Sequence, residues 1–253
     1  MRLPVARSLA SLSPAFRIWH AHRVTGLLHR HSPSDTSVYA FQPSDRTLSI
    51  GDHHASTFGY VVSGHVVVQH PLTRTQWALT KGQYWSLPGI CTLHCPPSAT
   101  HSDSKPSVFV VQKGAFTALN SAGGPVEPRG RLRYIDGCSD TVLVSPPHQG
   151  DPCLNMLYFP PACTQTAHTH PSFRVGVVAD GRGECLLHDA SPPVSLLPAS
   201  VFAIDTNLLH SFRTPPDSHL QVIAFHPDSD SGPTHHDHPM INQTIISPTS
   251  ANT

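Results

Sequence analysis

The sequence predicts an all-β protein built from two similar barrels, and three observations lead to this prediction. Prolines and glycines are frequent (26 and 16 in 253 residues), whereas glutamate, a strong helix former, occurs only at positions 127 and 184. Apolar residues gather in runs of about four to eight, separated by turn-forming residues, as in chains of short strands. The pattern also recurs at a fixed offset, which indicates two copies of one barrel.

The repeat is clearest around two pairs of glycines. Gly59 and Gly64 of GYVVSGHVVV fall on Gly176 and Gly181 of GVVADGRGECLL, an offset of 117 (176 − 59). Residues 81–88 fall on 198–205 at the same offset, and Phe41-Gln42-Pro43 is echoed by Phe159-Pro160-Pro161.

The strands expected in each barrel follow from these runs. In the first barrel they are residues 37–41, 58–70, 76–80 and 107–116, and in the second 133–137, 140–147, 154–161, 173–188, 201–205 and 220–227. Within 58–70, Ser63-Gly64 interrupts the apolar run from Tyr60 to Val68, and this predicts a hairpin with a tight glycine turn. Residues 121–130 (SAGGPVEPRG) have no periodicity and are the expected linker. We therefore expect an N-terminal arm (1–34), a first barrel (35–120), the linker (121–130), a second barrel (131–240) and a C-terminal tail (241–253).

The first 34 residues are open to two interpretations. They contain five arginines and no acidic residue, which is typical of a mitochondrial or plastid transit peptide. The alternative is that the part from about Trp19 onward is the first arm of the folded domain. The expected location is accordingly intracellular, either cytoplasmic or organellar.

Charge and cysteine content restrict the partners. Lys+Arg and Asp+Glu both total 16, so the sequence gives no electrostatic reason to expect a nucleic acid or an anionic membrane. No apolar run is long enough to span a membrane, and we expect a soluble protein. The six cysteines are too sparse for a disulfide framework and are expected to be reduced and structural. A small-molecule substrate is the expected partner, and a homodimer is compatible with this sequence.

Three histidines in the second barrel suggest a metal site. His168 and His170 are two residues apart, so on a strand both imidazoles would face the same side. His210 follows a second apolar segment and can supply a third ligand. Three imidazoles that leave coordination positions open are typical of catalytic sites rather than structural ones. The sequence therefore predicts one divalent metal ion per chain.

These segments resemble the paired motifs of the cupin superfamily, G-x5-H-x-H-x3-E-x6-G and G-x5-P-x-G-x2-H-x3-N. The first corresponds here to His168, His170 and Gly181, and the second runs from Pro198 to His210. The resemblance covers about residues 36–240 and implies a bicupin, with two tandem antiparallel jelly-roll barrels. This sequence departs from the motif at the glutamate position, which Arg174 occupies.

Arg174 is the expected substrate-binding residue. On an unbroken strand it would share the face of the two histidines, and a cation beside a divalent metal requires an anion. A substrate carboxylate is the simplest candidate. Three histidines with such an arginine are similar to cupin thiol dioxygenases and to bicupin dioxygenases that act on aromatic hydroxy-acids. The alternative is an ion pair of Arg174 with Asp205 or Glu184.

Two further residues are candidates for the same site. His226 ends the last strand before a His-rich segment that can fold back as a lid, so it is the candidate for a proton-transfer group or a fourth ligand. Gln165 is a candidate for a hydrogen bond to substrate. In the first barrel, the offset of 117 aligns His53 with His170 but does not provide a complete set of three ligands, so we expect no metal there.

The resulting hypothesis is a mononuclear Fe(II) dioxygenase that acts on a small carboxylate-bearing substrate. Three imidazoles also accept Zn, Mn, Ni or Cu, and the metal identity stays open. One alternative is a Zn- or Mn-dependent cupin isomerase, lyase or decarboxylase. The other is a non-enzymatic ligand-binding or storage-type bicupin.

Overall fold

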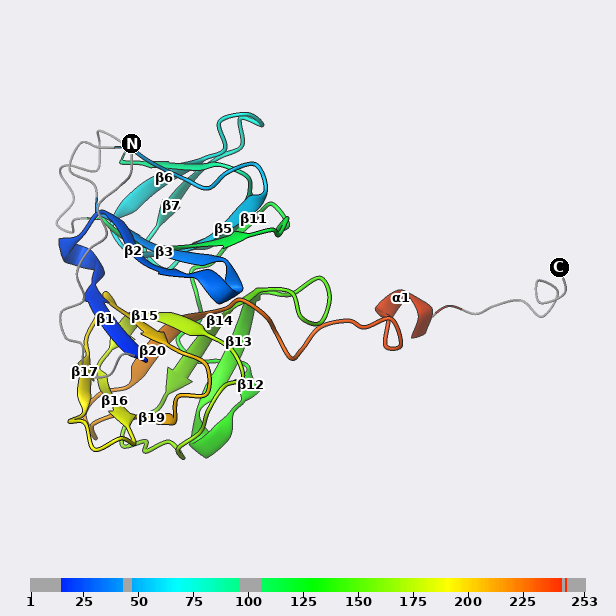
Figure 1. Ribbon diagram of the computed structural model, residues 1–253. Coiled ribbons are helices and arrows are strands. Elements are labelled where there is room, and N and C mark those ends of the chain that lie inside the picture. The colour runs from blue at the N-terminus through cyan, green and yellow to red at the C-terminus, as the bar shows by residue number, and fades with distance from the viewer. Residues whose placement is uncertain (1–14, 43–46, 96–105, 243, 245–253) are drawn as a thin grey trace, which may run out of the picture.

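The computed structural model describes residues 15–42, 47–95, 106–242 and 244, which fold almost entirely into β-strands (Figure 1). The strands of the first half are β2 (Gly26–His31), β3 (Thr36–Phe41), β4 (Leu48–Ile50), β5 (Ala55–Ser63), β6 (His65–Gln69), β7 (Gln76–Thr80), β8 (Tyr84–Pro88), β9 (Cys91–His94), β10 (Ser107–Gly114) and β11 (Ser121–Gly123). The strands of the second half are β12 (Leu132–Arg133), β13 (Ser139–Val144), β14 (Cys153–Phe159), β15 (Arg174–Gly181), β16 (Gly183–Leu187), β17 (Val194–Leu196), β18 (Ser200–Ile204), β19 (His210–Arg213) and β20 (Leu220–His226). A first strand, β1 (Phe16–His20), precedes both sets, and the short helix α1 (Pro239–Asn242) follows them.

The strands form two barrels of the same topology, each made of a large and a small antiparallel sheet. The large sheets have the orders β11-β8-β5-β10-β3-β2 and β1-β18-β15-β20-β14-β13-β12. The small sheets have the orders β4-β9-β6-β7 and β17-β16-β19. With β8, β5, β10, β3 and β2 matched to β18, β15, β20, β14 and β13, the two orders coincide over five consecutive strands. The all-β prediction and the predicted duplication of a jelly-roll barrel are therefore confirmed.

The two barrels pack through the outer faces of their large sheets. Alternate residues of each strand point to this interface, and the others point into the barrel. Phe58 of β5 contacts Phe225 of β20, with ring centroids 5.0 Å apart. One apolar cluster joins both halves across this interface, while a separate cluster fills each barrel. The upper and lower lobes of Figure 1 are these two barrels.

The glycine at position 64 does not close a hairpin, so that prediction was wrong. β5 pairs with β8 and β10 in the large sheet, whereas β6 pairs with β7 and β9 in the small sheet. Gly64 has φ +70°, and a Cβ there would lie 2.6 Å from Pro106 Cα. The glycine therefore permits a sharp change of direction that carries the chain from one sheet to the other.

The N-terminal strand β1 crosses to the second barrel. It pairs with β18, with Phe16 opposite Ile204, before β2 returns to pair with β3 in the first barrel. Phe16 and Trp19 are buried, and Arg17 forms an ion pair with Asp205 at 3.1 Å. Residues 16–31 thus contribute to both large sheets. Residues 1–14 lie outside the described part, and the compartment stays a prediction.

The expected linker between the barrels is partly a strand. In the expected linker, residues 121–123 form the edge strand β11, and the chain then passes through a cis Gly124-Pro125 peptide. No helix among the described residues is long and apolar enough to cross a membrane.

Candidate metal centre and substrate cavity

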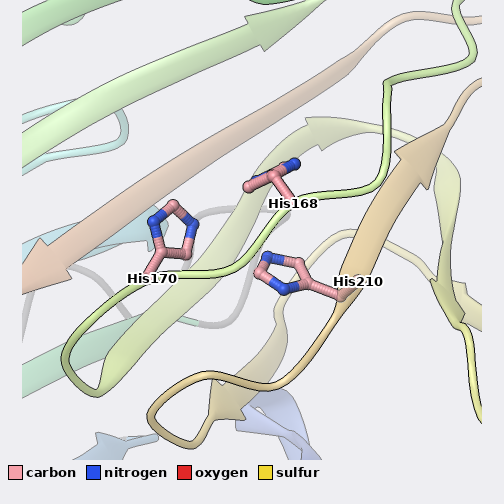
Figure 2. A group of neighbouring side chains, drawn as sticks. All are labelled: His168, His170 and His210. Atoms are coloured by element: carbon pink, nitrogen blue, oxygen red, sulfur yellow. The ribbon is translucent and has the colours of Figure 1, made fainter.

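Three histidines meet at one end of the second barrel (Figure 2). His168 and His170 lie in the segment before β15, and His210 begins β19. One potential ligand atom from each side chain lies within 4.8 Å of the others. Among the described residues this is the one group of three or more His, Cys, Asp and Glu side chains arranged in this way.

The local backbone differs from the unbroken strand expected for the two neighbouring histidines. Residues 164–173 lie outside the named strands, and His168 instead forms an isolated bridge with His210. The two residues exchange backbone hydrogen bonds, His168 N to His210 O at 2.9 Å and the reverse at 3.0 Å. This bridge, rather than the alternation of side chains along a strand, brings His168 next to His210.

The hydrogen bonds of two imidazoles leave a nitrogen free to bind a metal ion. His168 Nδ1 lies 2.9 Å from Thr166 O, and His210 Nδ1 lies 2.8 Å from Leu208 O. A carbonyl oxygen only accepts, so each Nδ1 carries the proton and each Nε2 offers a lone pair. His210 Nε2 is buried and has no partner among the described residues. Such hydrogen bonds are typical of metal-binding histidines, so these residues fit a divalent metal.

Electrostatics also favours neutral imidazoles in the cluster. Burial, followed by the nearby Arg174 guanidinium and the other imidazoles, lowers the pKa of His170 to about 3. Burial is also the main reason that the pKa of His210 is lowered to about 4. Neutral imidazoles are the form that binds a metal, and two of the three need lose no proton near neutral pH.

Asp136 supports the cluster from outside. Its carboxylate accepts hydrogen bonds from the Thr166 backbone N–H at 2.6 Å and from the Thr166 hydroxyl at 3.1 Å. Because the Thr166 carbonyl accepts a hydrogen bond from His168 Nδ1, Asp136 helps to orient this imidazole by holding Thr166. This role was not predictable from the sequence, since Asp136 lies 32 residues before His168 (168 − 136).

The cluster opens into a cavity of about 340 Å³ inside the second barrel. The floor is formed by β13, β14, β20, β15 and β18, which are adjacent in the large sheet. Gly176 lies in the middle of this floor, where a Cβ would lie 2.8 Å from Phe202 and 2.9 Å from Val222. The missing side chain lets Phe202 lie flat against the floor.

Arg174 lies at the wall of the cavity and is 7% exposed. Its Nη1 pairs with Asp228 Oδ1 at 3.3 Å and also contacts the Ser172 hydroxyl and the Phe173 carbonyl. Its Nε is buried and has no acceptor among the described residues. The guanidinium is thus anchored on one side and has an unused donor on the other.

The two acids considered as alternative partners of Arg174 are bound elsewhere. Asp205 pairs with Arg17, and Glu184 pairs with Arg213. The observed partner, Asp228, belongs to the segment that follows β20. Its side chain is 54% exposed, so water screens its carboxylate more than it screens the buried guanidinium.

The other two candidate residues line the same cavity. Gln165 is 3% exposed, and its Oε1 has no partner among the described residues. His226 lies on the floor beside Arg174, and burial together with the Arg174 charge lowers its pKa well below the ordinary value. His226 is not part of the three-histidine cluster, so its expected role as a fourth ligand or proton-transfer group remains a prediction. The segment after it does fold back, because Ser229 O accepts from Gly150 N at 2.9 Å and residues 229–231 line the cavity.

Sequence reasoning missed two polar residues of the floor, Asp140 on β13 and Asn155 on β14. Asn155 Nδ2 donates to Asp140 Oδ2 at 3.1 Å, while Asp140 Oδ1 and Asn155 Oδ1 are buried without a partner among the described residues. Burial raises the pKa of Asp140, and the Asn155 amide opposes this shift. The available signal was a polar residue on the inward side of two otherwise apolar runs.

Comparison with known proteins finds similarity in the fold but not in the sequence. No family model and no curated protein matches this sequence. Solved structures do match. The putative glyoxylate-induced protein from Pseudomonas aeruginosa superposes with a TM-score of 0.59 and 12% identity, over 92% of this chain and 95% of that chain. A cupin 2 conserved barrel domain protein from Leptotrichia buccalis gives 0.52 and 11%, over 84% of each chain.

An enzyme is also among the similar structures. A variant of the salicylate 1,2-dioxygenase from Pseudoaminobacter salicylatoxidans matches with a TM-score of 0.51 and 11% identity, over 75% of this chain and 70% of that chain. The same variant has been solved in complex with gentisate, with a TM-score of 0.51. At these identities the likeness concerns the fold. Together with the matching strand orders of the two halves, it shows that this chain has the bicupin fold, with two tandem cupin barrels and a three-histidine cluster in the second.

Proposed function

We propose that this protein is a mononuclear metal-dependent enzyme, an Fe(II) dioxygenase that acts on a small carboxylate-bearing substrate. The observation that carries the proposal is that Arg174, whose Nε has no acceptor among the described residues, lines the same cavity as the three histidines. A ferrous ion bound by His168, His170 and His210 would supply Lewis acidity and redox chemistry with O₂.

Arg174 binds and orients the substrate in this proposal. Its Nε donates to a carboxylate oxygen, in a charge-assisted bond that is strengthened by burial. Asp228 and Ser172 hold the other side of the guanidinium, so little side-chain entropy is lost when substrate binds. Phe202, Phe212 and Val222 line the cavity and exclude water from the bound molecule.

His226 accepts or donates the proton of the reaction. It faces the same cavity as Arg174, and its lowered pKa keeps it neutral and able to accept a proton at neutral pH. Gln165 offers its amide to a polar group of the substrate near the histidines.

Metal analysis and oxygen uptake test the proposal. Protein purified without added metal is analysed for metal content and then assayed for O₂ consumption with a panel of small carboxylic acids and thiols. Iron with substrate-dependent O₂ consumption supports a dioxygenase. Bound zinc or manganese without O₂ consumption would move the protein to the isomerase, lyase or decarboxylase class, and absence of a metal would support a binding protein.

Two substitutions at position 174 test the role of the arginine. Arg174→Gln is expected to retain the metal and to weaken carboxylate binding by roughly 2–5 kcal/mol, the cost of losing one partner of a desolvated charge pair. Arg174→Glu places a carboxylate near the imidazoles, so metal affinity should rise while turnover of an anionic substrate falls. Arg182→Gln, which breaks the exposed pair with Asp217, is the matched control. Unchanged turnover by Arg174→Gln would refute the carboxylate-binding role.

A further inference from the structure

The cavity contains a second polar group whose hydrogen-bonding capacity is unused. Asp140 and Asn155 lie on the adjacent strands β13 and β14, where Asp140 is opposite Leu157 and Asn155 is opposite Val142. Both line the same cavity as Arg174. The bond from Asn155 Nδ2 to Asp140 Oδ2 fixes the orientation of the amide, because a carboxylate oxygen accepts only from the NH₂ side.

This orientation leaves one acceptor oxygen on each of the two hydrogen-bonded side chains without a donor. Asp140 Oδ1 and Asn155 Oδ1 are both buried, and neither has a donor among the described residues. A buried acceptor without a donor destabilises the protein, so an unpaired pair inside a cavity is typical of a site that is completed by a ligand.

The chemistry of the pair selects the ligand group. Two acceptors require two hydrogens, which an ammonium or a primary amide nitrogen can supply, whereas a hydroxyl supplies one. The carboxylate of Asp140 also favours a cation over a neutral group. A donor with two N–H bonds therefore fits better than an alcohol or a phenol.

Strand register places the acceptor pair and Arg174 on the same floor, because Asn155 of β14 is opposite Ala224 of β20, and Ala224 is opposite Gly176, two residues after Arg174 on β15. Burial is the main reason that the pKa of the Cys153 thiol is raised to about 12; the Arg174 charge opposes this shift and the Asp140 charge adds to it. The same two charges act in opposite directions on the pKa of Tyr134, which burial also raises. Tyr134 and Cys153 line the cavity, so the two charges lie at different places around one space.

We propose that Asp140 and Asn155 form a second subsite that binds a nitrogen donor of the substrate, so that the substrate is an amino carboxylate or an amide-bearing carboxylate. The inference rests on the proposed function, because Arg174 binds the other end of the same molecule. Its positive charge and the negative charge of Asp140 complement a zwitterion.

Matched ligand pairs test this subsite. Binding to the metal-loaded protein is measured by calorimetry for β-alanine against propionate, 4-aminobutyrate against butyrate, 4-aminobenzoate against benzoate, and succinamate against butyrate. At least one nitrogen-bearing ligand should bind about tenfold or more tightly than its partner without nitrogen, the effect of one hydrogen bond to a charged group. 3-Hydroxypropionate should resemble propionate.

Variants of the subsite should remove this preference selectively. Asp140→Asn and, separately, Asn155→Leu should bring the affinity ratio of the matched pair close to one, with the affinity for the ligand without nitrogen unchanged. Melting temperatures show whether each variant is folded. Asp189→Asn, an exposed carboxylate of the same barrel outside the cavity, should keep the ratio of the wild type.

The outcomes separate this inference from the proposed function. If no matched pair is distinguished by the wild type, or if the preference survives both substitutions, the subsite does not exist and solvent satisfies the two oxygens. Metal content and the dependence of propionate or benzoate affinity on Arg174 would be unaffected by that result. Absence of metal, or affinities that do not change in Arg174→Gln, would instead refute the proposed function.

Discussion

The two barrels share a strand order, yet among the described residues the histidine cluster and the cavity beside it lie in the second barrel, and the difference lies in a few equivalent positions. Gly59 and Gly176 both lie at the centre of the floor, opposite Trp85 and Phe202 respectively. In the first barrel the indole lies directly against Gly59, where a Cβ would be 2.1 Å from the ring, and Trp85 is fully buried. The larger side chain fills the space that is open in the second barrel.

Strand register shows which residues replace the site. Ala224 is opposite Gly176 in the second barrel, just as Val110 is opposite Gly59 in the first, so the two sheets can be aligned at these pairs. Two residues before Gly59, Thr57 takes the place of Arg174. Gln112, which is opposite Thr57, takes the place of His226. In the small sheets, Leu93 is opposite Val68 just as Phe212 is opposite Cys185, so Leu93 corresponds to Phe212. Two residues earlier, Cys91 therefore takes the place of His210. The first barrel is filled by apolar side chains, whereas the second has a cavity with His210, Arg174 and His226 around it.

The largest expected effect concerns metal content. His210→Ala or His168→Ala should abolish metal binding, because two imidazoles hold a divalent ion weakly. Cys91→Ala and His53→Ala should leave one metal ion per chain. Metal analysis of the purified variants checks this, and retention of metal by both histidine variants would mean that the cluster is not the metal site.

The next largest effect compares the filled barrel with the open one. Trp85→Ala should lower the free energy of unfolding by about 3–5 kcal/mol, because it creates a cavity in a close-packed interior. Phe202→Ala should cost roughly half as much, because this ring already borders a cavity and loses fewer contacts. Denaturant unfolding of both variants gives the two values, and equal losses would contradict the proposed difference in packing.

The edge strands of the two large sheets provide a third comparison. Ile18 of β1 is 6% exposed against β18, so Ile18→Ala should cost about 2–5 kcal/mol. Ala122 of β11 is exposed at the corresponding edge next to β8, and Ala122→Gly should change stability by no more than about 0.5 kcal/mol. If the two substitutions have the same effect, β1 is not packed as described.

The smallest effect concerns His29 of β2, which lies between the rings of Trp19 and Phe173. Burial, followed by the Arg17 charge, lowers its pKa from 6.5 to about 4. Between these pH values the unfolded chain binds the proton and the folded chain does not, so stability falls as the pH decreases through this interval. His29→Leu should reduce this loss between pH 7.5 and pH 5, as measured by denaturant unfolding of the metal-free protein. An unchanged difference between the two pH values would assign the acid sensitivity to other groups.

Much of the fold was predictable, because each short apolar run is a local pattern that indicates a strand, and the repeat shows that the same set of strands occurs twice. The change of sheet at Gly64 was not, and a hairpin was predicted there instead, since a turn glycine has the same appearance whether the next strand stays in the sheet or leaves it. At the site, His168, His170 and His210 were found from spacing, although a backbone bridge rather than a strand brings them together. Asp140 and Asn155 were missed because strand parity becomes informative only once the inward face is known.

The crossing of β1 has a consequence for the order in which this protein folds during its synthesis. The partner of Arg17, Asp205, is 188 residues further along the chain. The first barrel and most of the second are therefore synthesised before β1 can pair with β18. Contacts of such long separation form late and slowly. Until β18 (Ser200–Ile204) emerges, β1 has no strand to pair with, and its apolar residues lack the contacts that bury them in the folded protein.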